Sequence, residues 1–227
     1  MAPTQDIMER LFLWKTEVNY RGTVFHQRIV SDATIEDARQ YALIASRKLR
    51  RELRDSASDA YLIHLDPMND LSDEDLKNAI VYGESRAVVN DFIRSNPRRV
   101  VEKPGNDATL EDQEVYQAEL EKRDTEYAEE LRRNVELWEV DFRRAADKWD
   151  RERLVYQYTQ LQTDSVCNAK FTEMFEQYVL AMSVYLDAKF KQRAFTLEEF
   201  ASLPSEVRGL FRESYNQINI GADDIKN

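Results

Sequence analysis

The chain is poor in the residues that disulfides, metal centres and phosphate-binding loops require. Cys167 is the only cysteine among 227 residues, so no intramolecular disulfide can form and a reducing compartment is expected. The two histidines, His26 and His64, have no spacing typical of a metal or catalytic site, and the five glycines form no recognised phosphate-binding pattern. We therefore expect no cofactor, no bound metal and no catalytic residues, and the prediction is that the chain is not an enzyme.

Long apolar runs are also missing, and one sign of charge is in excess. No stretch approaches the roughly 18 apolar residues of a membrane span, and no basic segment followed by an apolar one indicates a signal peptide. The formal net charge of -11 repels nucleic acids and anionic membranes at long range. The sequence thus predicts a soluble, cytoplasmic protein that does not contact membranes and for which nucleic acid is a disfavoured partner.

Between Asn106 and Leu203 the sequence has no glycine and no proline. Because these two residues most often interrupt helices, their absence predicts long helices. Two interleaved series at seven-residue intervals predict an apolar seam of coiled-coil type along the first helix. The seam consists of Leu131, Val135, Trp138, Phe142, Ala145, Trp149 and Tyr156.

The polar triplet Thr163-Asp164-Ser165 is the expected break in this helical region. After it, a broad and largely aromatic stripe follows at helical spacing. The stripe consists of Phe171, Met174, Phe175, Tyr178, Met182, Tyr185, Leu186 and Phe190. If the second helix returns antiparallel to the first, the two stripes cover each other, and residues 109–192 form a long helical hairpin.

Alternating apolar and polar residues over 11–30 predict a β-hairpin near the start of the chain. A helix follows, and the short apolar run over 60–65 is the expected third strand, so that residues 8–66 form a small ββαβ module. Short helices are expected over 67–95, with an interruption at Gly83. The segment 96–108 contains two prolines and a glycine and is therefore the expected linker and domain boundary.

Helix-start signals and ion pairs complete the prediction of the fold class. Thr109 precedes Asp112 and Thr196 precedes Glu199 by three residues, which is the spacing of a capping box. Four acid-first pairs at i,i+4 are expected to stabilise the first long helix. These pairs are Glu119–Arg123, Glu129–Arg133, Glu139–Arg143 and Asp147–Arg151. The predicted fold is mainly α, with a small α+β N-terminal module, a long coiled-coil-like helical hairpin, and a C-terminal cap of helices over 196–220.

Aromatic residues of the two stripes are the candidate contacts with a partner protein. Tryptophan and tyrosine often anchor protein interfaces, yet the same residues also pack against each other inside a helical hairpin. The packing interpretation is favoured for most of them, and any aromatic surface left uncovered is expected to meet a partner. The candidates are Trp138, Phe142, Trp149, Tyr156, Phe171, Phe175, Tyr178 and Tyr185.

A second candidate surface is the arginine face, which consists of Arg47, Arg50, Arg51 and Arg54. The four residues fall on one side of a helix, at i, i+3, i+4 and i+7. Such a face can contact a phosphate backbone or an acidic protein surface. The alternative is a solvated face whose arginines pair with neighbouring acids such as Glu52 and Asp55.

The C-terminal part of the chain carries one resemblance. The segment Phe195-Thr196-Leu197-Glu198-Glu199-Phe200-Ala201-Ser202-Leu203-Pro204-Ser205-Glu206-Val207 is followed by an amphipathic helix that ends at Asn219. This arrangement resembles the ends of small acidic helical proteins encoded among tailed-phage virion genes, some of which are tail assembly chaperones or other accessory tail proteins. The resemblance implies a helical, protein-binding factor of a viral particle, located in the host cytoplasm or in the virion, and it transfers no functional residues.

The resulting functional expectation is a non-enzymatic protein–protein interaction factor with a structural or assembly role. Its partners are expected to be other proteins, including virion components or further copies of the same chain. The first alternative is a nucleic-acid-associated accessory factor that uses the arginine face. The second is an enzyme of unfamiliar type that uses carboxylates of the long helical region, although these alternate with arginine and lysine as they do on a solvated face.

Overall fold

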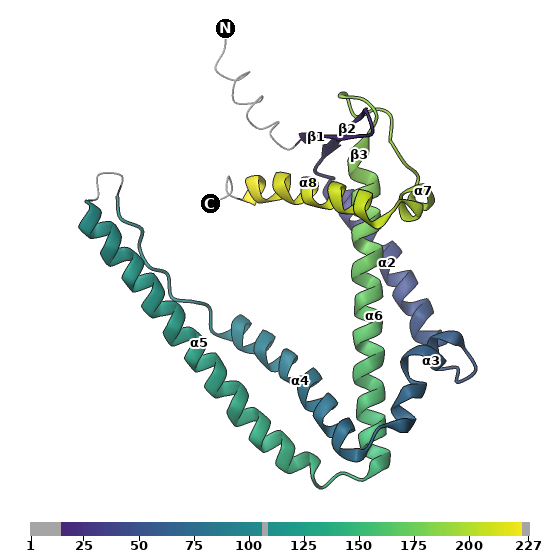
Figure 1. Ribbon diagram of the computed structural model, residues 1–227, viewed down its shortest axis with the longest axis vertical. Coiled ribbons are helices and arrows are strands. Elements are labelled where there is room, and N and C mark those ends of the chain that lie inside the picture. Colours follow the sequence, from purple (N-terminus) through teal and green to yellow (C-terminus); the bar gives the residue numbers. More distant parts are fainter. Residues whose placement is uncertain (1–14, 106–108, 224–227) are drawn as a thin grey trace. The chain divides into compact units, whose positions relative to one another are not determined.

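The computed structural model describes residues 15–105 and 109–223, and the side chains of residues 15–105 and 109–218 (Figure 1). The chain folds as two compact units. Unit 1 combines the chain up to Arg54 with the chain from Val166 onward, and unit 2 runs from Asp55 to Ser165. The predicted boundary segment 96–108 therefore falls inside unit 2. Among the described helices, none is both long enough and apolar enough to cross a membrane.

The predicted mainly helical fold with a β-hairpin near the start is confirmed. Strands β1 (Lys15–Tyr20) and β2 (Thr23–Arg28) pair antiparallel. The turn between them has positive φ at both central residues, Arg21 (49°) and Gly22 (82°), as a tight hairpin with right-handed twist requires. Residues 11–14 of the predicted hairpin lie outside the described residues.

The predicted third strand over 60–65 is wrong, because this run lies in helix α3 (Asp59–His64). The Ser58 hydroxyl accepts a hydrogen bond from the Tyr61 N–H at 3.1 Å and so starts a helix. An apolar run of six residues does not reveal its period, so the sequence pattern fitted either element. The third strand is instead β3 (Val184–Tyr185), which pairs antiparallel with β2. The described sheet therefore has the order β1-β2-β3, and the predicted ββαβ module is not formed as such.

Unit 1 is built around a core of aromatic and aliphatic side chains under the sheet. Helices α7 (Leu197–Ser202) and α8 (Ser205–Asp223) confirm the predicted C-terminal helices. They bring Phe200 and Phe211, which are 1% and 0% exposed, against Phe25 of β2. Helix α2 (Asp32–Glu52) packs on the second half of α6 (Arg151–Ser183), where the Ser46 hydroxyl donates to the Cys167 carbonyl at 3.0 Å.

Unit 2 is dominated by a long antiparallel helix pair. Helix α4 (Asp73–Ser95) lies beside α5 (Leu110–Ala146), and α3 and the 3-10 helix η1 (Asp66–Asp70) precede them (Figure 1). At one end of the pair, Lys77 Nζ lies 3.1 Å from Asp147 Oδ1. Towards the other end, the rings of Phe92 and Tyr127 are 5.5 Å apart. A long helical hairpin is thus present, but α4 and α5 form it, rather than the two parts of residues 109–192.

The predicted helix break at 163–165 is also wrong, because these residues lie within α6. The chain leaves helical structure over 147–150 instead. There the Asp150 carboxylate accepts a hydrogen bond from the Arg153 N–H at 2.9 Å and starts α6. Asp147 ends α5 as its C-cap. Because neither glycine nor proline is present at this turn, its only signal in the sequence was a pair of aspartates.

Gly83 does not interrupt α4, which is continuous from Asp73 to Ser95. A Cβ atom at this position would lie 2.2 Å from a methyl carbon of Leu161 on α6. The glycine therefore permits close packing of two helices inside unit 2. The expected interruption was wrong because a glycine within a helix serves either as a breaker or as a site of close approach, and the sequence alone does not distinguish the two.

Candidate interaction surfaces

Three of the candidate aromatic residues are packed at the inner end of unit 2, the end where α5 meets the start of α6. The rings of Trp138 and Phe142 are 4.9 Å apart, and those of Phe142 and Trp149 are 5.5 Å apart in an edge-on arrangement. Phe142 and Trp149 pack against a buried cluster. That cluster consists of Met68, Leu76, Ile80 and Leu154. These rings fill the space between helices. They therefore pack inside the fold, as the packing interpretation of the sequence expected, and are not left open to a partner.

The aromatic residues of unit 1 are also engaged. Phe171 and Phe175 stack on each other at 6.2 Å, and the Tyr178 ring lies 5.5 Å from that of Tyr41 on α2. Helix α6 ends at Ser183, so Tyr185 belongs to β3 and does not continue the predicted helical stripe.

Tyr185 is 5% exposed, and its ring is contacted by the guanidinium groups of Arg28 at 5.0 Å and Arg193 at 5.7 Å. Among the eight aromatic candidates, Tyr156 alone is largely exposed, at 60%. The exposed aromatic surface expected from the sequence is therefore small.

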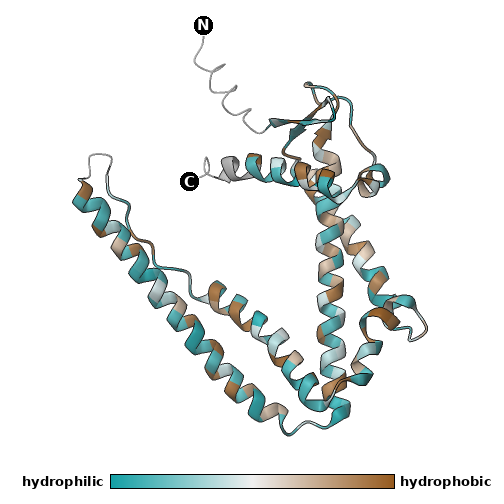
Figure 2. Cartoon of the chain, in the orientation of Figure 1, coloured by the Kyte–Doolittle hydropathy of each residue, from teal (hydrophilic) through white to brown (hydrophobic). Residues whose placement is uncertain are grey.

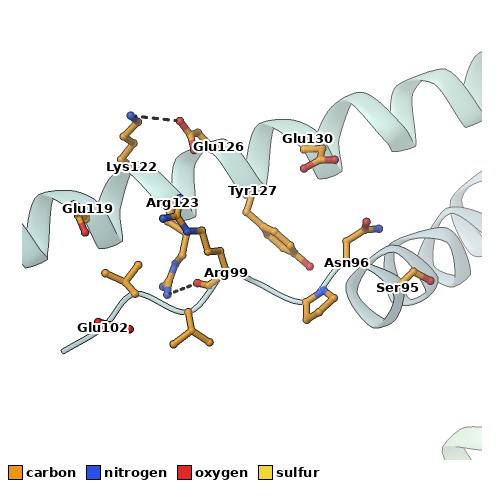
Figure 3. Close-up of a pocket in the computed structure, with 13 residues that line it drawn as sticks. Ser95, Asn96, Arg99, Glu102, Glu119, Lys122, Arg123, Glu126, Tyr127 and Glu130 are labelled. Carbon is orange, nitrogen blue, oxygen red and sulfur yellow. Dashed lines mark hydrogen bonds and ion pairs between the residues drawn. The ribbon is translucent and has the colours of Figure 1, made fainter.

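A groove runs along the outer half of α5, defined as residues 110–130 (Figure 3). Helix α4 ends at Ser95, and from there the non-helical segment 96–105 continues alongside α5. The space between this segment and α5 has a volume of about 830 Å³. Apolar lining is provided by Pro97, Val100, Val101 and Tyr127. The charged lining residues are Arg99, Glu102, Glu119, Lys122, Arg123, Glu126 and Glu130.

Few contacts hold the segment 96–105 on α5. The Arg98 guanidinium lies over the Tyr127 ring at 5.2 Å, and Arg123 donates a hydrogen bond to the Arg99 carbonyl at 3.3 Å. Within the described part of the chain, the backbone of residues 98–103 makes no hydrogen bond to other backbone groups. The side chain of Val100 is 82% exposed. Apart from the Arg99 carbonyl, the main-chain groups of this wall have no backbone partner among the described residues, and the wall also exposes an apolar side chain.

The outer half of α5 is strongly acidic. Residues 110–130 include nine acidic and two basic side chains, whereas residues 131–146 include three acidic and four basic ones. In Figure 2 the helix is coloured as hydrophilic over much of its length. The capping box at its start is confirmed: Asp112 Oδ2 accepts hydrogen bonds from the Thr109 hydroxyl at 2.7 Å and the Thr109 N–H at 2.9 Å. These bonds lower the pKa of the Asp112 carboxyl and so stabilise one further negative charge at this end.

Of the predicted arginine face, Arg47, Arg50 and Arg51 lie on the last turns of α2 in unit 1, and Arg54 lies in the turn that follows the helix. Arg47, Arg51 and Arg54 are exposed, and Arg50 is half-buried. Among the residues that the structure describes, no acidic side chain forms an ion pair with Arg47, Arg51 or Arg54. Neighbouring acids therefore do not neutralise these three arginines, in contrast to the alternative considered from the sequence. Cations near a helix C-terminus also interact favourably with the helix dipole, which accounts for part of their placement.

The histidines and carboxylates of the described residues form no metal-binding cluster. No group of three or more histidine, cysteine or carboxylate side chains is placed to hold a metal ion within 15–105 and 109–218. His26 Nδ1 lies 3.3 Å from the carboxylate of Glu17 on the neighbouring strand, and His64 is exposed at the end of α3.

Sequence reasoning identified the arginine face but missed the groove, because it treated residues 96–108 as a linker. A signal for the groove was present in the contrast between the acidic residues 110–130 and the nearly balanced residues that follow. Comparisons of the chain with models of known families, with curated proteins and with solved structures found no match.

Proposed function

We propose that this chain is a non-enzymatic protein–protein interaction factor with a structural or assembly role, and that the groove beside the outer half of α5 is its binding site. The proposal rests on one observation. Beyond the end of α4, the element of unit 2 that continues beside α5 is a non-helical segment, and the space between the two is open and lined by side chains of both.

The apolar part of this site favours a protein partner. Val100, which is 82% exposed, lines the groove, and Val115, which is 55% exposed, lines a neighbouring hollow between α5 and the segment 96–105. Large apolar side chains gathered at a hollowed surface are typical of contacts with another protein. The charged rim supplies the polar surroundings that such interfaces usually have.

The main chain of the segment favours a particular mode of binding. An extended peptide can add to a strand-like segment whose N–H and C=O groups are unpaired, and the alternate side chains then enter pockets. Except at the Arg99 carbonyl, which accepts from Arg123, the backbone of residues 98–103 offers these groups next to the groove. A partner segment bound here gains main-chain hydrogen bonds from the segment 96–105 on one side and contacts with Tyr127 of α5 on the other.

A role in a virus particle is proposed on the sequence resemblance alone. The segment that carries it forms α7 and the start of α8, and the Thr196–Glu199 capping box is formed, with the Glu199 carboxylate accepting the Thr196 N–H at 2.8 Å. The partner of the groove is then another virion component or an assembly intermediate.

Site-specific photo-crosslinking tests the groove. A photoreactive amino acid replaces Val100, and the full-length protein is irradiated in its native source. We expect one discrete protein adduct from position 100 and none from the matched control position Leu137, which is 64% exposed on the inner half of α5. Equal labelling from both positions, or no adduct from position 100, would refute the assignment of the groove as the binding site.

A further inference from the structure

We propose that the arginine face of one copy docks on the outer half of α5 of a second copy, so that the chain associates head to tail. This inference goes beyond the proposed function, because it uses side chains outside the groove. The charges of the two regions are opposite and concentrated. Residues 38–54 contain six basic side chains and one acidic side chain, while residues 110–130 contain nine acidic and two basic ones.

The basic side of this contact is free in the structure. Arg47, Arg51 and Arg54 are exposed and form no ion pair with any acid among the residues described. They occur on an acidic protein of net charge -11, where most other surfaces repel a second copy. An exposed basic face on such a chain gives a specific place where a second acidic copy is attracted, and charge complementarity of this kind fixes orientation and partner choice.

The acidic side presents matching side chains, which we call the acid face: Glu111, Glu114 and Glu121. At 3.6 residues per turn they fall on one side of α5, away from Tyr127 and the groove. They are exposed, and within the described residues none of them has an ion pair with a basic side chain. Glu114 and Glu121 are seven residues apart, which is also the separation of Arg47 and Arg54. Arg47 and Arg51 lie on α2 and Arg54 lies in the turn after it, so the basic side chains surround the end of this helix and can meet a row of glutamates of similar length along the chain.

A second copy is favoured over nucleic acid as the occupant of the arginine face. Three arginines are few for phosphate binding when the rest of the chain is strongly negative, since each added nucleotide brings further repulsion from those other surfaces. A second copy places its acid face against the arginines. Unlike a nucleic acid, it does not extend a continuous run of negative charge beyond this contact. Because the two faces differ, the contact is heterologous, and its repetition generates rings or open chains of subunits.

Charge reversal in two variants tests the proposal. The arginine variant is R47E/R51E/R54E, and the acid variant is E111K/E114K/E121K. Self-association of each full chain is measured by sedimentation at about 50 mM and about 500 mM salt, because exposed ion pairs are screened at high ionic strength. We expect the wild-type chain to associate at low salt and to dissociate at high salt. The affinity of each variant for itself should fall by at least about tenfold, because three surface ion pairs are lost.

Mixing the two variants gives the decisive result. The arginine variant keeps an intact acid face and the acid variant keeps an intact arginine face, so these two faces can pair in the mixture. The two reversed faces are also opposite in charge. We therefore expect heterodimers that extend into alternating assemblies at low salt, although neither variant associates alone. A control variant with the same charge change elsewhere, R86E/R133E/K189E, should associate as the wild-type chain does.

Three outcomes would overturn the proposal: a wild-type chain that stays monomeric at low salt, a mixture that forms no heterodimer although both variants keep the helical content of the wild-type chain, or an arginine face that binds single-stranded DNA while the chain stays monomeric. Failure of this proposal leaves the crosslink from position 100 unaffected, because Val100 belongs to the groove. The two hypotheses are therefore tested separately.

Discussion

The two ends of the α4–α5 pair differ although the same helices form both. At the inner end, Phe142 and Trp149 lie against Leu76 and Leu154, both 0% exposed, and Lys77 forms an ion pair across to Asp147. At the outer end α4 has stopped, and α5 faces a non-helical segment held by a few contacts around Tyr127. The difference shows that two parts of one long helix can be packed to different degrees. The inner part of α5 is stabilised by burial, and the outer part is left available for binding.

Charge follows the same division. The acidic residues of the outer half outnumber the basic ones by nine to two, and the excess disappears where α4 begins to cover the helix. A buried or half-buried helix face needs balanced charges, because unpaired charges are costly to remove from water. An exposed binding surface has no such requirement and can hold an excess that selects its partner.

The largest effect is expected from shortening a buried side chain at the inner end. Leu154→Ala removes a fully buried leucine from the cluster with Met68, Leu76 and Ile80, and the free energy of unfolding should fall by about 2–5 kcal/mol. Urea denaturation followed by circular dichroism measures the change. The control Leu137→Ala, at a side chain that is 64% exposed, should cost less than about 0.5 kcal/mol. Similar losses in both variants would contradict the assignment of the inner end as the core.

A smaller effect is expected at the outer end. Tyr127→Ala removes the ring contact with Phe92 and the ring beneath the Arg98 guanidinium, with an expected cost of about 1–2 kcal/mol. Because these contacts hold the segment 96–105, its proteolysis should become faster, and the melting temperature should fall by only a few degrees. Limited digestion followed by mass spectrometry locates the cleavage. Unchanged cleavage between residues 96 and 105 would show that Tyr127 does not position the segment.

The smallest effect concerns the start of α5 and depends on pH. The Thr109 hydroxyl and N–H bonds lower the pKa of Asp112, so the contribution of its carboxylate is present at neutral pH and is lost as pH falls through the lowered pKa. NMR signals of the first turn of α5 should therefore lose helical character at acidic pH before those of the inner half do. Asp112→Asn should show the same fraying already at neutral pH. If the NMR signals of the first turn keep their helical character after both changes, the capping box does not stabilise this turn.

The sequence predicted local features of this fold better than long-range ones. The hairpin turn at Gly22 and the capping boxes at Thr109 and Thr196 were correct, because each depends on neighbouring residues. By contrast, the expected partner of the long helix was wrong. Seam residues such as Phe142 were identified, but the apolar pattern of one helix does not determine which other helix covers it.

Ion pairs show the same limit at the scale of single side chains. Of the four predicted i,i+4 pairs, Glu139–Arg143 is formed, at 3.0 Å. Asp147 and Arg151 instead pair with residues of another segment, Lys77 and Asp73. A charged side chain near a helix end meets competing partners from the rest of the fold, and these partners are not visible in the spacing along one helix. The groove was missed for the same reason, since it depends on where α4 stops relative to α5.

Amide hydrogen exchange along α5 in the isolated protein tests the contrast between its two ends most directly. Exchange in a folded protein reports the free energy of local opening, which is low where few contacts cover the helix. The account predicts that amides of residues 131–146 exchange at least about tenfold more slowly than those of residues 114–124, after correction for intrinsic rates, which corresponds to about 1.4 kcal/mol or more. Equal protection along the whole helix would contradict it, because the outer half would then be as firmly held as the inner half.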